Sequence, residues 1–236
     1  MSEREKLLRI AIDGPSGAGK STVAKRLAKE YQIDYVDTGA MYRAMGLKLI
    51  RTNTKCEEGP ELMMLLEKTD VDYRDWKVYL DGEDVSEFIR TEEVSKMASD
   101  CSAFASVRNK LDSIQKSIGR SRSVVMDGRD ICTVVMPHAE FKLYITASAE
   151  ERARRRYLEL KSKGQNPDYD QVLEDINKRD YNDTHRDVNP LRVADDAIVI
   201  DTTEMDIDQV VDYAKTIIDG GNLAYVEGFN VGDELE

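Results

Sequence analysis

The sequence contains few of the residues that build disulfide frameworks or metal sites. Among its 236 residues there are three cysteines and two histidines, and no two cysteines form a CxxC pair. An odd number of widely spaced cysteines is typical of reduced thiols rather than of disulfides or a zinc site. We therefore expect Cys56, Cys101 and Cys132 to be reduced, and we assign neither catalysis nor a metal to His138 or His185.

Long hydrophobic runs and an excess of basic residues are also absent. No apolar stretch approaches the roughly 18 residues that a membrane helix requires. The first 13 residues carry charge into the first predicted strand and lack the apolar core of a signal peptide. The formal net charge is −12, whereas nucleic-acid-binding proteins usually present a basic face. We therefore expect a cytoplasmic protein that binds neither membranes nor nucleic acids, and we expect it to be a monomer.

What the chain does contain is a regular alternation of short apolar runs and helical patterns. The runs are mostly continuous and are bounded by polar or turn residues, which is typical of strands buried on both faces of a parallel sheet. They lie at 8–12, 35–36, 124–126, 141–145 and 197–200. Helical periodicity covers 21–31 and a long segment, 93–117. This order predicts an α/β fold with a doubly wound, five-stranded parallel sheet and ligands at the carboxyl ends of its strands.

Two segments depart from this alternation. Residues 71–86 alternate apolar and polar side chains and contain Asp81-Gly82, a dipeptide typical of a hairpin turn, so they predict a small antiparallel insert. We expect Trp76, within this insert, to serve packing. The segment after residue 218 begins with Asp-Gly-Gly, has no helical period and is acidic, which predicts a loosely attached extension.

A glycine-rich motif follows the first predicted strand. Residues 14–21 read GPSGAGKS and match G-x-x-x-x-G-K-S between a strand and a helix. In such a loop, backbone N–H groups converge on an anion, the lysine reaches the β- and γ-phosphates, and the hydroxyl binds Mg²⁺. The motif predicts a nucleoside triphosphate site with Ser21 as the metal ligand. Its residues are Gly14, Pro15, Ser16, Gly17, Ala18, Gly19, Lys20, Ser21 and Thr22.

The loop alone does not separate kinases from other nucleotide-binding proteins. The sequence lacks the N-K-x-D motif of Ras-type GTPases and the LSGGQ segment of ABC-type ATPases. It does distribute arginines over separated segments, at Arg43, Arg108, Arg129 and 152–186. A transferase that brings two phosphorylated substrates together needs such repeated arginine contacts, so the pattern favours a kinase.

Five segments in order resemble the bacterial cytidylate kinases, a family of nucleoside monophosphate kinases. They are DGPSGAGKST at 13–22, DTGAMYR at 37–43, MDGRDICTVVMP at 126–137, EERARRRYLEL at 150–160 and KRDYNDTHRDVNPL at 178–191. The resemblance implies a P-loop kinase domain over 1–218 that includes a monophosphate-binding insert at about 62–95 and a short helical lid at about 150–190. Residues 219–236 are then an acidic C-terminal extension.

The same resemblance implies phosphoryl transfer from ATP to CMP and dCMP, with Mg²⁺ as cofactor. It assigns Lys20, Arg152 and Arg156 to catalysis, the two arginines lying one helical turn apart on a shared face. We expect Arg154 and Arg155 to lie on a solvated face instead. The residues that it assigns to CMP are Thr38, Arg43, Ser99, Arg108, Arg129, Asp130, Arg179, Asp183 and Arg186.

The resemblance also divides these residues between the parts of the acceptor. Thr38 and Arg43 are assigned to its phosphate, and Asp183 to its ribose hydroxyls. Arg129, Arg179 and Arg186 are shared between phosphate and ribose. Asp130, Ser99 and Arg108 are assigned to cytosine, because a carboxylate accepts from the N4 amino group and a guanidinium donates toward N3 and O2.

Several alternatives remain open at the level of sequence. One alternative is another small-molecule kinase, whose acceptor would be UMP, AMP or shikimate. The other is a regulatory nucleotide-binding protein, which would hydrolyse ATP slowly without an acceptor. Instead of binding phosphate, Arg43 would be a charge on the surface. Instead of binding cytosine, Asp130 would form an ion pair with Arg129 or another arginine. Asp13 and Asp127 either orient Mg²⁺-bound water or make structural hydrogen bonds.

Overall fold

The central sheet of the computed structural model, which describes residues 7–220, has the five parallel strands that the apolar runs predict. The strands are β1 (Arg9–Asp13), β2 (Asp34–Asp37), β6 (Val124–Asp127), β7 (Phe141–Thr146) and β8 (Ile198–Asp201). Their order across the sheet is β2-β6-β1-β7-β8. Ile10 in the central strand lies opposite Val125 on one side and Phe141 on the other. The extension predicted at 219–236 falls, from residue 221 onward, outside the described residues.

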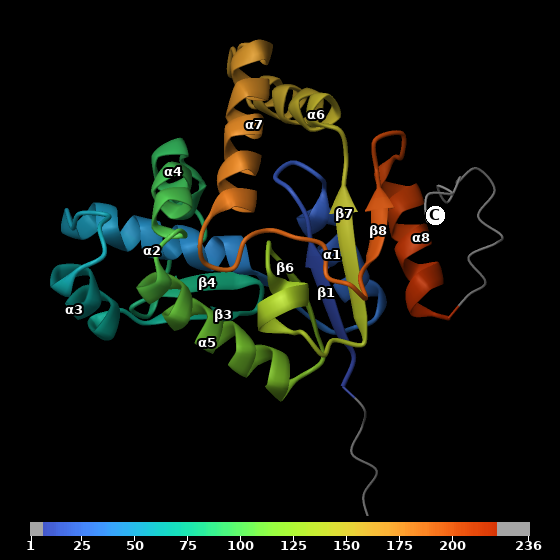
Figure 1. Ribbon diagram of the computed structural model, residues 1–236. Helices are drawn as coiled ribbons and strands as arrows, with labels where there is room; N and C mark the ends of the chain where they lie inside the picture. The colour runs from blue at the N-terminus through green and yellow to red at the C-terminus, as the bar shows by residue number, and fades with distance from the viewer. Residues whose placement is uncertain (1–6, 221–236) are drawn as a thin grey trace, which may run out of the picture.

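Helices cover both faces of this sheet (Figure 1). The α-helices are α1 (Lys20–Glu30), α2 (Thr38–Thr52), α3 (Pro60–Lys68), α4 (Glu92–Cys101), α5 (Ala105–Ser121), α6 (Ala149–Ser162), α7 (Tyr169–His185) and α8 (Ile207–Ile218). Two short helical turns are η1 (Phe88–Arg90) and η2 (Ile131–Val135).

Successive side chains of each strand point into different layers, because the side-chain period of a strand is two. Ile10 and Ile12 belong to the core shared with α1 and α8, whereas Ala11 belongs to the core shared with α2, α4 and α5. Val36 and Met126 join Ala11 in the second layer. The sheet is therefore doubly wound, as predicted.

The prediction of one long helix over 93–117 was wrong. The chain forms two helices there, α4 and α5, separated by a turn at 102–104 in which Phe104 has extended backbone angles. The two helices differ in their main partners, since α4 packs chiefly on α2 whereas α5 contacts α3 and η2 as well as α2. The break also places the carbonyl oxygen of Ser102 where it accepts a hydrogen bond from Arg108, at 3.0 Å.

The predicted antiparallel insert is a sheet of three strands, β3 (Val71–Arg74), β4 (Lys77–Leu80) and β5 (Glu83–Asp84). The expected turn at Asp81-Gly82 joins β4 to β5, with positive φ angles of 50° and 85°. A second turn of this kind, at Asp75-Trp76, joins β3 to β4 and was not predicted. Trp76 is 37 % exposed, and its ring lies edge-on to that of Tyr35 with centroids 5.6 Å apart, so it packs only in part.

Helices α6 and α7 form a hairpin that projects beyond the carboxyl ends of the strands (Figure 1). The two helices share a small apolar core of Ala153, Leu160, Val172 and Ile176, separate from the two cores of the sheet. Because so little apolar surface is buried, the α6–α7 hairpin depends on polar contacts at its base for its position.

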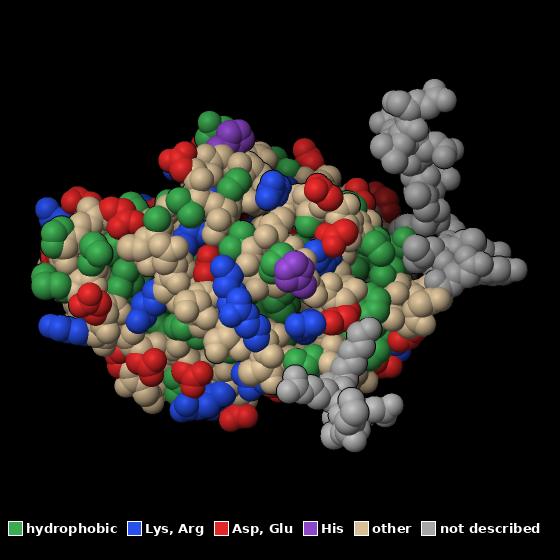
Figure 2. Space-filling view, turned by 60° about the horizontal axis from the view of Figure 1, so that its bottom comes forward, with side chains coloured by type: hydrophobic (Ala, Val, Ile, Leu, Met, Phe, Trp, Pro, Cys, Tyr) green, Lys and Arg blue, Asp and Glu red, His purple; other side chains and the backbone are tan. Residues whose placement is uncertain are grey.

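The surface seen in Figure 2 shows acidic and basic side chains interspersed among uncharged ones. No helix within residues 7–220 combines the length and apolar character needed to cross a membrane. All three cysteines are free thiols, as predicted, and Cys101 and Cys132 are buried.

Candidate active site

The phosphate loop connects β1 to α1 at the carboxyl edge of the sheet. Gly14 has a φ of 144°, and a Cβ atom there would lie 1.9 Å from the carbonyl oxygen of Ile145, so only glycine fits. Gly19 precedes α1 with a φ of 87° and turns the chain into the helix. This loop therefore has the backbone shape that directs N–H groups toward an anion at a helix N-terminus.

Lys20 is the first residue of α1, and its side chain folds back along the loop. Its Nζ donates to the carbonyl oxygen of Pro15 at 2.7 Å. The side chain is buried, and this burial together with the neighbouring Arg129 guanidinium lowers the pKa of Lys20 to about 7. A bound phosphate chain would reverse this effect, because an adjacent negative charge favours the ammonium form.

Three more cations converge on the same edge from separate elements. Arg43 comes from α2, Arg129 follows β6, and Arg179 comes from α7, and the charge of Arg179 interacts with those of both other arginines. Burial and Arg129 lower the pKa of Arg179 to about 10. Its guanidinium has no hydrogen bond or ion pair among residues 7–220, and its buried Nε atom has no partner. A buried N–H group without a partner is costly, so the unpartnered Nε of the half-buried Arg179 indicates an anionic ligand.

Carboxylates hold the other arginines of this edge in place. Arg43 pairs with Asp37 at 2.9 Å, and Arg129 pairs with Asp183 at 2.8 Å. Burial alone would raise the pKa of Asp183, but the guanidiniums of Arg129, Arg179 and Arg186 together outweigh it and keep the pKa below its ordinary value. Asp183 is therefore an ionised acceptor facing the site.

Arg152 joins the α6–α7 hairpin to the phosphate loop. Its guanidinium contacts Asp180 of α7 at 2.6 Å and donates to the carbonyl oxygen of Ser16 at 3.1 Å. Sequence reasoning missed Asp180 and Asp37 as partners, although Asp180 adjoins Arg179 in the segment KRDYND. The hairpin thus carries two cations, Arg152 and Arg179, over the loop.

A second buried cluster lies beyond these cations. Arg108 of α5 is 1 % exposed and donates to Asp130 at 2.6 Å, while Asp130, which follows β6, is 4 % exposed. The Arg108 guanidinium also lies 5.4 Å from the centre of the Tyr42 ring. Arg186, at the end of α7, comes within 3.8 Å of Asp130. Asp130 is thus ion-paired with an arginine, in a buried cluster that contains both a carboxylate and guanidinium donors.

Comparison with known proteins identifies the family. The cytidylate kinase family model matches residues 10–219. A cytidylate kinase of Caldicellulosiruptor saccharolyticus is 51 % identical over 210 residues, covering 87 % of this chain and 93 % of that protein. A cytidylate kinase of Caldanaerobacter subterraneus subsp. tengcongensis is 51 % identical over 205 residues, covering 87 % and 92 % of the two chains. The chain belongs to the cytidylate kinase family.

The solved structures support the fold of this cytidylate kinase family member. An uncharacterized protein from Eubacterium ventriosum matches with a TM-score of 0.53 and 16 % identity, covering 91 % of this chain and 99 % of that chain. At this level of identity the likeness concerns the fold alone.

A donor set suited to Mg²⁺ lies beside the phosphate loop of this family member. The Ser21 hydroxyl donates to one carboxylate oxygen of Asp127 at 2.8 Å, and the Tyr35 hydroxyl donates to the other at 2.8 Å. A hydroxyl and a carboxylate are hard oxygen donors of the kind that Mg²⁺ takes together with substrate phosphates, so these residues fit the ion.

Asp13 makes structural hydrogen bonds, one of the two alternatives that the sequence left open. Its two oxygens accept from the backbone N–H groups of Ile131 and Cys132, at 2.9 and 2.7 Å. Burial raises the pKa of the Asp13 carboxyl to about 6, against the lowering effect of these two hydrogen bonds. Asp13 therefore anchors the segment after Asp130 to β1, and both of its oxygens are engaged.

Three residues that the cytidylate kinase resemblance assigns to the site have other partners in this structure. Arg156 is paired with Glu159 at 2.9 Å and its side chain is 42 % exposed. The Thr38 hydroxyl donates to the carbonyl oxygen of Asp127 at 2.7 Å. Ser99 is half-buried, and its carbonyl oxygen accepts from the Ser102 hydroxyl at 2.8 Å.

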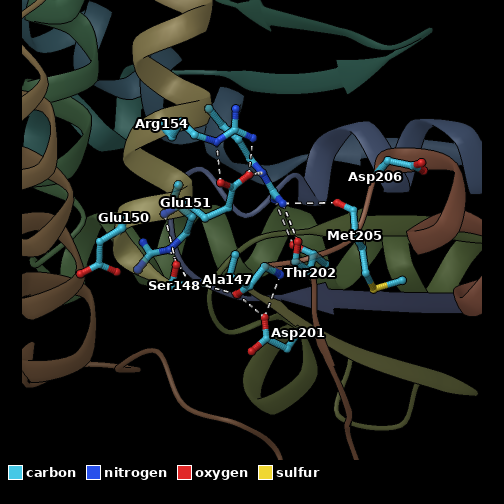
Figure 3. Close-up of polar contacts among 12 residues, drawn as sticks. Ala147, Ser148, Glu150, Glu151, Arg154, Asp201, Thr202, Met205 and Asp206 are labelled. Carbon is cyan, nitrogen blue, oxygen red and sulfur yellow. Dashed lines mark hydrogen bonds and ion pairs between the residues drawn. The ribbon is translucent and has the colours of Figure 1, made fainter. Parts of the chain in front are cut away.

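The expectation that Arg155 lies on a solvated face was wrong. Figure 3 shows the base of α6, with Glu151 and Arg154, against the loop after β8, with Thr202 and Met205. The Arg155 guanidinium donates there to Thr202 Oγ1 at 3.0 Å and to the carbonyl oxygens of Thr202 and Met205. Glu151 accepts from both Arg154 and Arg155, and Arg154 is exposed as expected. The 100° step between helical neighbours turns Arg155 toward the β8–α8 loop, so it fixes the base of the hairpin.

Proposed function

We propose that this family member transfers the γ-phosphoryl group of ATP to CMP and dCMP, yielding ADP with CDP or dCDP. The observation that carries this proposal is the arrangement along one sheet edge. The charge of Lys20 in the phosphate loop interacts with those of Arg129 and Arg179. Arg129 pairs with Asp183, and Arg186 lies 3.7 Å from Asp183 and 3.8 Å from Asp130, the partner of the buried Arg108. Such an order suits two nucleotides joined through their phosphates.

In the proposed mechanism the protein forms no covalent intermediate. Lys20 and Arg152 neutralise charge on the transferring group, and Arg129 and Arg179 bind phosphate oxygens from the acceptor side. Arg156 joins them by exchanging Glu159 for phosphate when the α6–α7 hairpin closes as a lid. An exposed ion pair contributes only about 0–1 kcal/mol, so this exchange costs little. Closure excludes water and aligns the two nucleotides in line.

Recognition of the acceptor is assigned to the residues beyond these cations. Asp130 accepts from the N4 amino group of cytosine, and Arg108 and Ser99 face the rest of the base. The ion pair with Arg108 leaves Asp130 free to do this, because a carboxylate offers about four lone-pair sites. Asp183 accepts from ribose hydroxyls, Arg186 contacts the sugar and phosphate, and Thr38 and Arg43 bind the phosphate.

We further propose Mg²⁺ as the cofactor, held by Ser21 with Asp127 beside it. When bound, the ion would neutralise charge on the phosphates of ATP. ATP, CMP and dCMP are the proposed small-molecule partners. We also propose that it acts as a monomer in the cytoplasm.

A coupled assay of ADP release with CMP, dCMP, UMP, AMP and shikimate tests the proposal. We expect fast ADP release only when CMP or dCMP is present. Slow release that is independent of every acceptor would instead identify a nucleotide-hydrolysing regulatory protein. Fast release with shikimate or AMP alone would refute the assignment of the acceptor.

A further inference from the structure

A buried carboxylate beside the Arg108–Asp130 pair has no part in the mechanism described above. Asp112 lies one helical turn after Arg108 on α5 and is 5 % exposed. One of its oxygens accepts from the Tyr42 hydroxyl at 3.4 Å, and the other accepts from the side-chain amide of Asn189 at 3.1 Å. Burying a carboxylate is costly without compensating contacts. The position of Asp112 beside the proposed acceptor site therefore suggests that this carboxylate has a function there.

Asn189 lies in the segment that returns from α7, in a tight turn with a φ of 51°. Its backbone carbonyl oxygen accepts two hydrogen bonds from the Arg186 guanidinium, from Nε at 2.8 Å and from Nη2 at 2.5 Å. The carboxylates nearest to Arg186 are farther away, Asp183 at 3.7 Å and Asp130 at 3.8 Å. Among residues 7–220 the carbonyl of Asn189 is therefore the group that fixes the direction of this guanidinium.

These contacts form a chain from α5 to the acceptor site. Asp112 accepts from the side-chain amide of Asn189, and the carbonyl oxygen of Asn189 accepts from Arg186. Arg186 in turn lies 3.8 Å from Asp130 and 3.7 Å from Asp183. The first of these hydrogen bonds joins residues 77 positions apart. It therefore connects the α5 side of the pocket to the segment that follows the α6–α7 hairpin.

The surrounding charges are consistent with such a link. Burial, followed by the neighbouring Asp130 carboxylate, raises the pKa of Asp112, and the Arg108 guanidinium opposes this rise. Arg108 and Arg186 are two buried guanidiniums that repel one another. Asp112 supplies negative charge next to them in addition to that of Asp130.

We propose that Asp112 and Asn189 are positioning residues for the acceptor nucleotide, which set the direction of the Arg186 guanidinium through the Asn189 turn. The proposal rests on the role assigned above to Arg186 in acceptor binding. Neither residue touches the donor nucleotide in this scheme, so their loss affects the acceptor selectively.

Substitution of Asn189 by glycine tests the proposal without disturbing the backbone, because glycine adopts a positive φ freely. We expect Asn189→Gly to raise KM for CMP by about tenfold, the scale of one lost hydrogen bond to a charged group. KM for ATP is expected to stay within about twofold of the parent value, because the phosphate loop is untouched.

Exchange of the two partners gives a sharper test. Asn189→Asp alone places two carboxylates in contact, and we expect KM for CMP to rise by about tenfold or more. The double variant Asp112→Asn with Asn189→Asp restores a donor facing an acceptor and the parent's net charge, and it should return KM to within about threefold of the parent value. Asn109→Asp, the same chemical change at an exposed position of α5, is the matched control and should leave KM unchanged.

The outcomes separate this proposal from the proposed function. If the parent protein phosphorylates a monophosphate other than CMP, the proposed function is refuted. The positioning role is then tested by the same KM comparison with that other acceptor. An unchanged acceptor KM in Asn189→Gly would overturn the positioning role, as would a parallel rise in KM for ATP. Absence of rescue in the double variant, with a melting temperature like that of the parent, would also overturn it.

Discussion

Replacement of Lys20 by methionine is expected to lower turnover by about 10²-fold or more, the scale of removing one preorganised donor from a transition state. The ammonium lies buried against the loop, and burial with Arg129 lowers its pKa to about 7. Methionine has a similar length and relieves this cost of burial. The loop shape depends on the backbone of Gly14 and Gly19, so we expect the variant to fold normally.

Steady-state kinetics together with thermal melting would measure this effect. Lys29→Met is a matched control, since it makes the same change at an exposed position of the same helix. Near-normal turnover of a folded Lys20→Met protein would contradict the assignment of residues 14–21 as the triphosphate site. A loss of equal size in Lys29→Met would show that the effect is not specific to the loop.

The second large effect concerns the choice of base. We expect Asp130→Asn to reduce kcat/KM for CMP by tens-fold or more, since a good paired base contact contributes about 1–3 kcal/mol of discrimination. The asparagine amide would donate toward cytosine N4, where an acceptor is needed, but would suit the O4 acceptor of uracil. Activity on UMP should therefore fall less, and the CMP:UMP ratio should narrow.

The CMP:UMP activity ratio distinguishes an effect of Asp130→Asn on base recognition from an effect on protein stability. Asp130 is paired with Arg108 at 2.6 Å, so Asp130→Asn also perturbs a buried pair. A loss of folded protein lowers both activities equally and leaves their ratio unchanged. Asp187→Asn removes the same charge at an exposed position and should change neither value. An unchanged CMP:UMP ratio in Asp130→Asn would remove this residue from base recognition.

The features that could be predicted from sequence are those encoded by contiguous residues. The phosphate loop is read directly, because its glycines, lysine and hydroxyl are neighbours in the chain and act largely through backbone geometry. The five strands are also recognisable, since strands such as Val124–Asp127 are buried on both faces and are apolar almost throughout. The turn at Asp81-Gly82 has the chemistry that a tight hairpin requires.

What was missed depends on residues distant in sequence. The periodicity of 93–117 does not reveal the turn at 102–104, where α4, packed chiefly on α2, is followed by α5, which also contacts α3 and η2. The sequence does not distinguish Arg155 from its exposed neighbour Arg154, because the β8–α8 loop that Arg155 contacts is distant in the chain. Pairs such as Arg108 with Asp130, or Asp112 with Asn189, join elements whose contact is set by the fold and carry no local signal.

Direct competition between CMP and UMP, present in equal amounts with ATP and Mg²⁺, tests base recognition and phosphoryl transfer together when the products are separated by ion-exchange chromatography. We expect CDP to appear together with ADP, and UDP to form at least tens-fold more slowly, as expected for a site with one or more paired base contacts. Formation of UDP at a comparable rate would contradict the proposed reading of cytosine, and release of inorganic phosphate in place of CDP would contradict phosphoryl transfer itself.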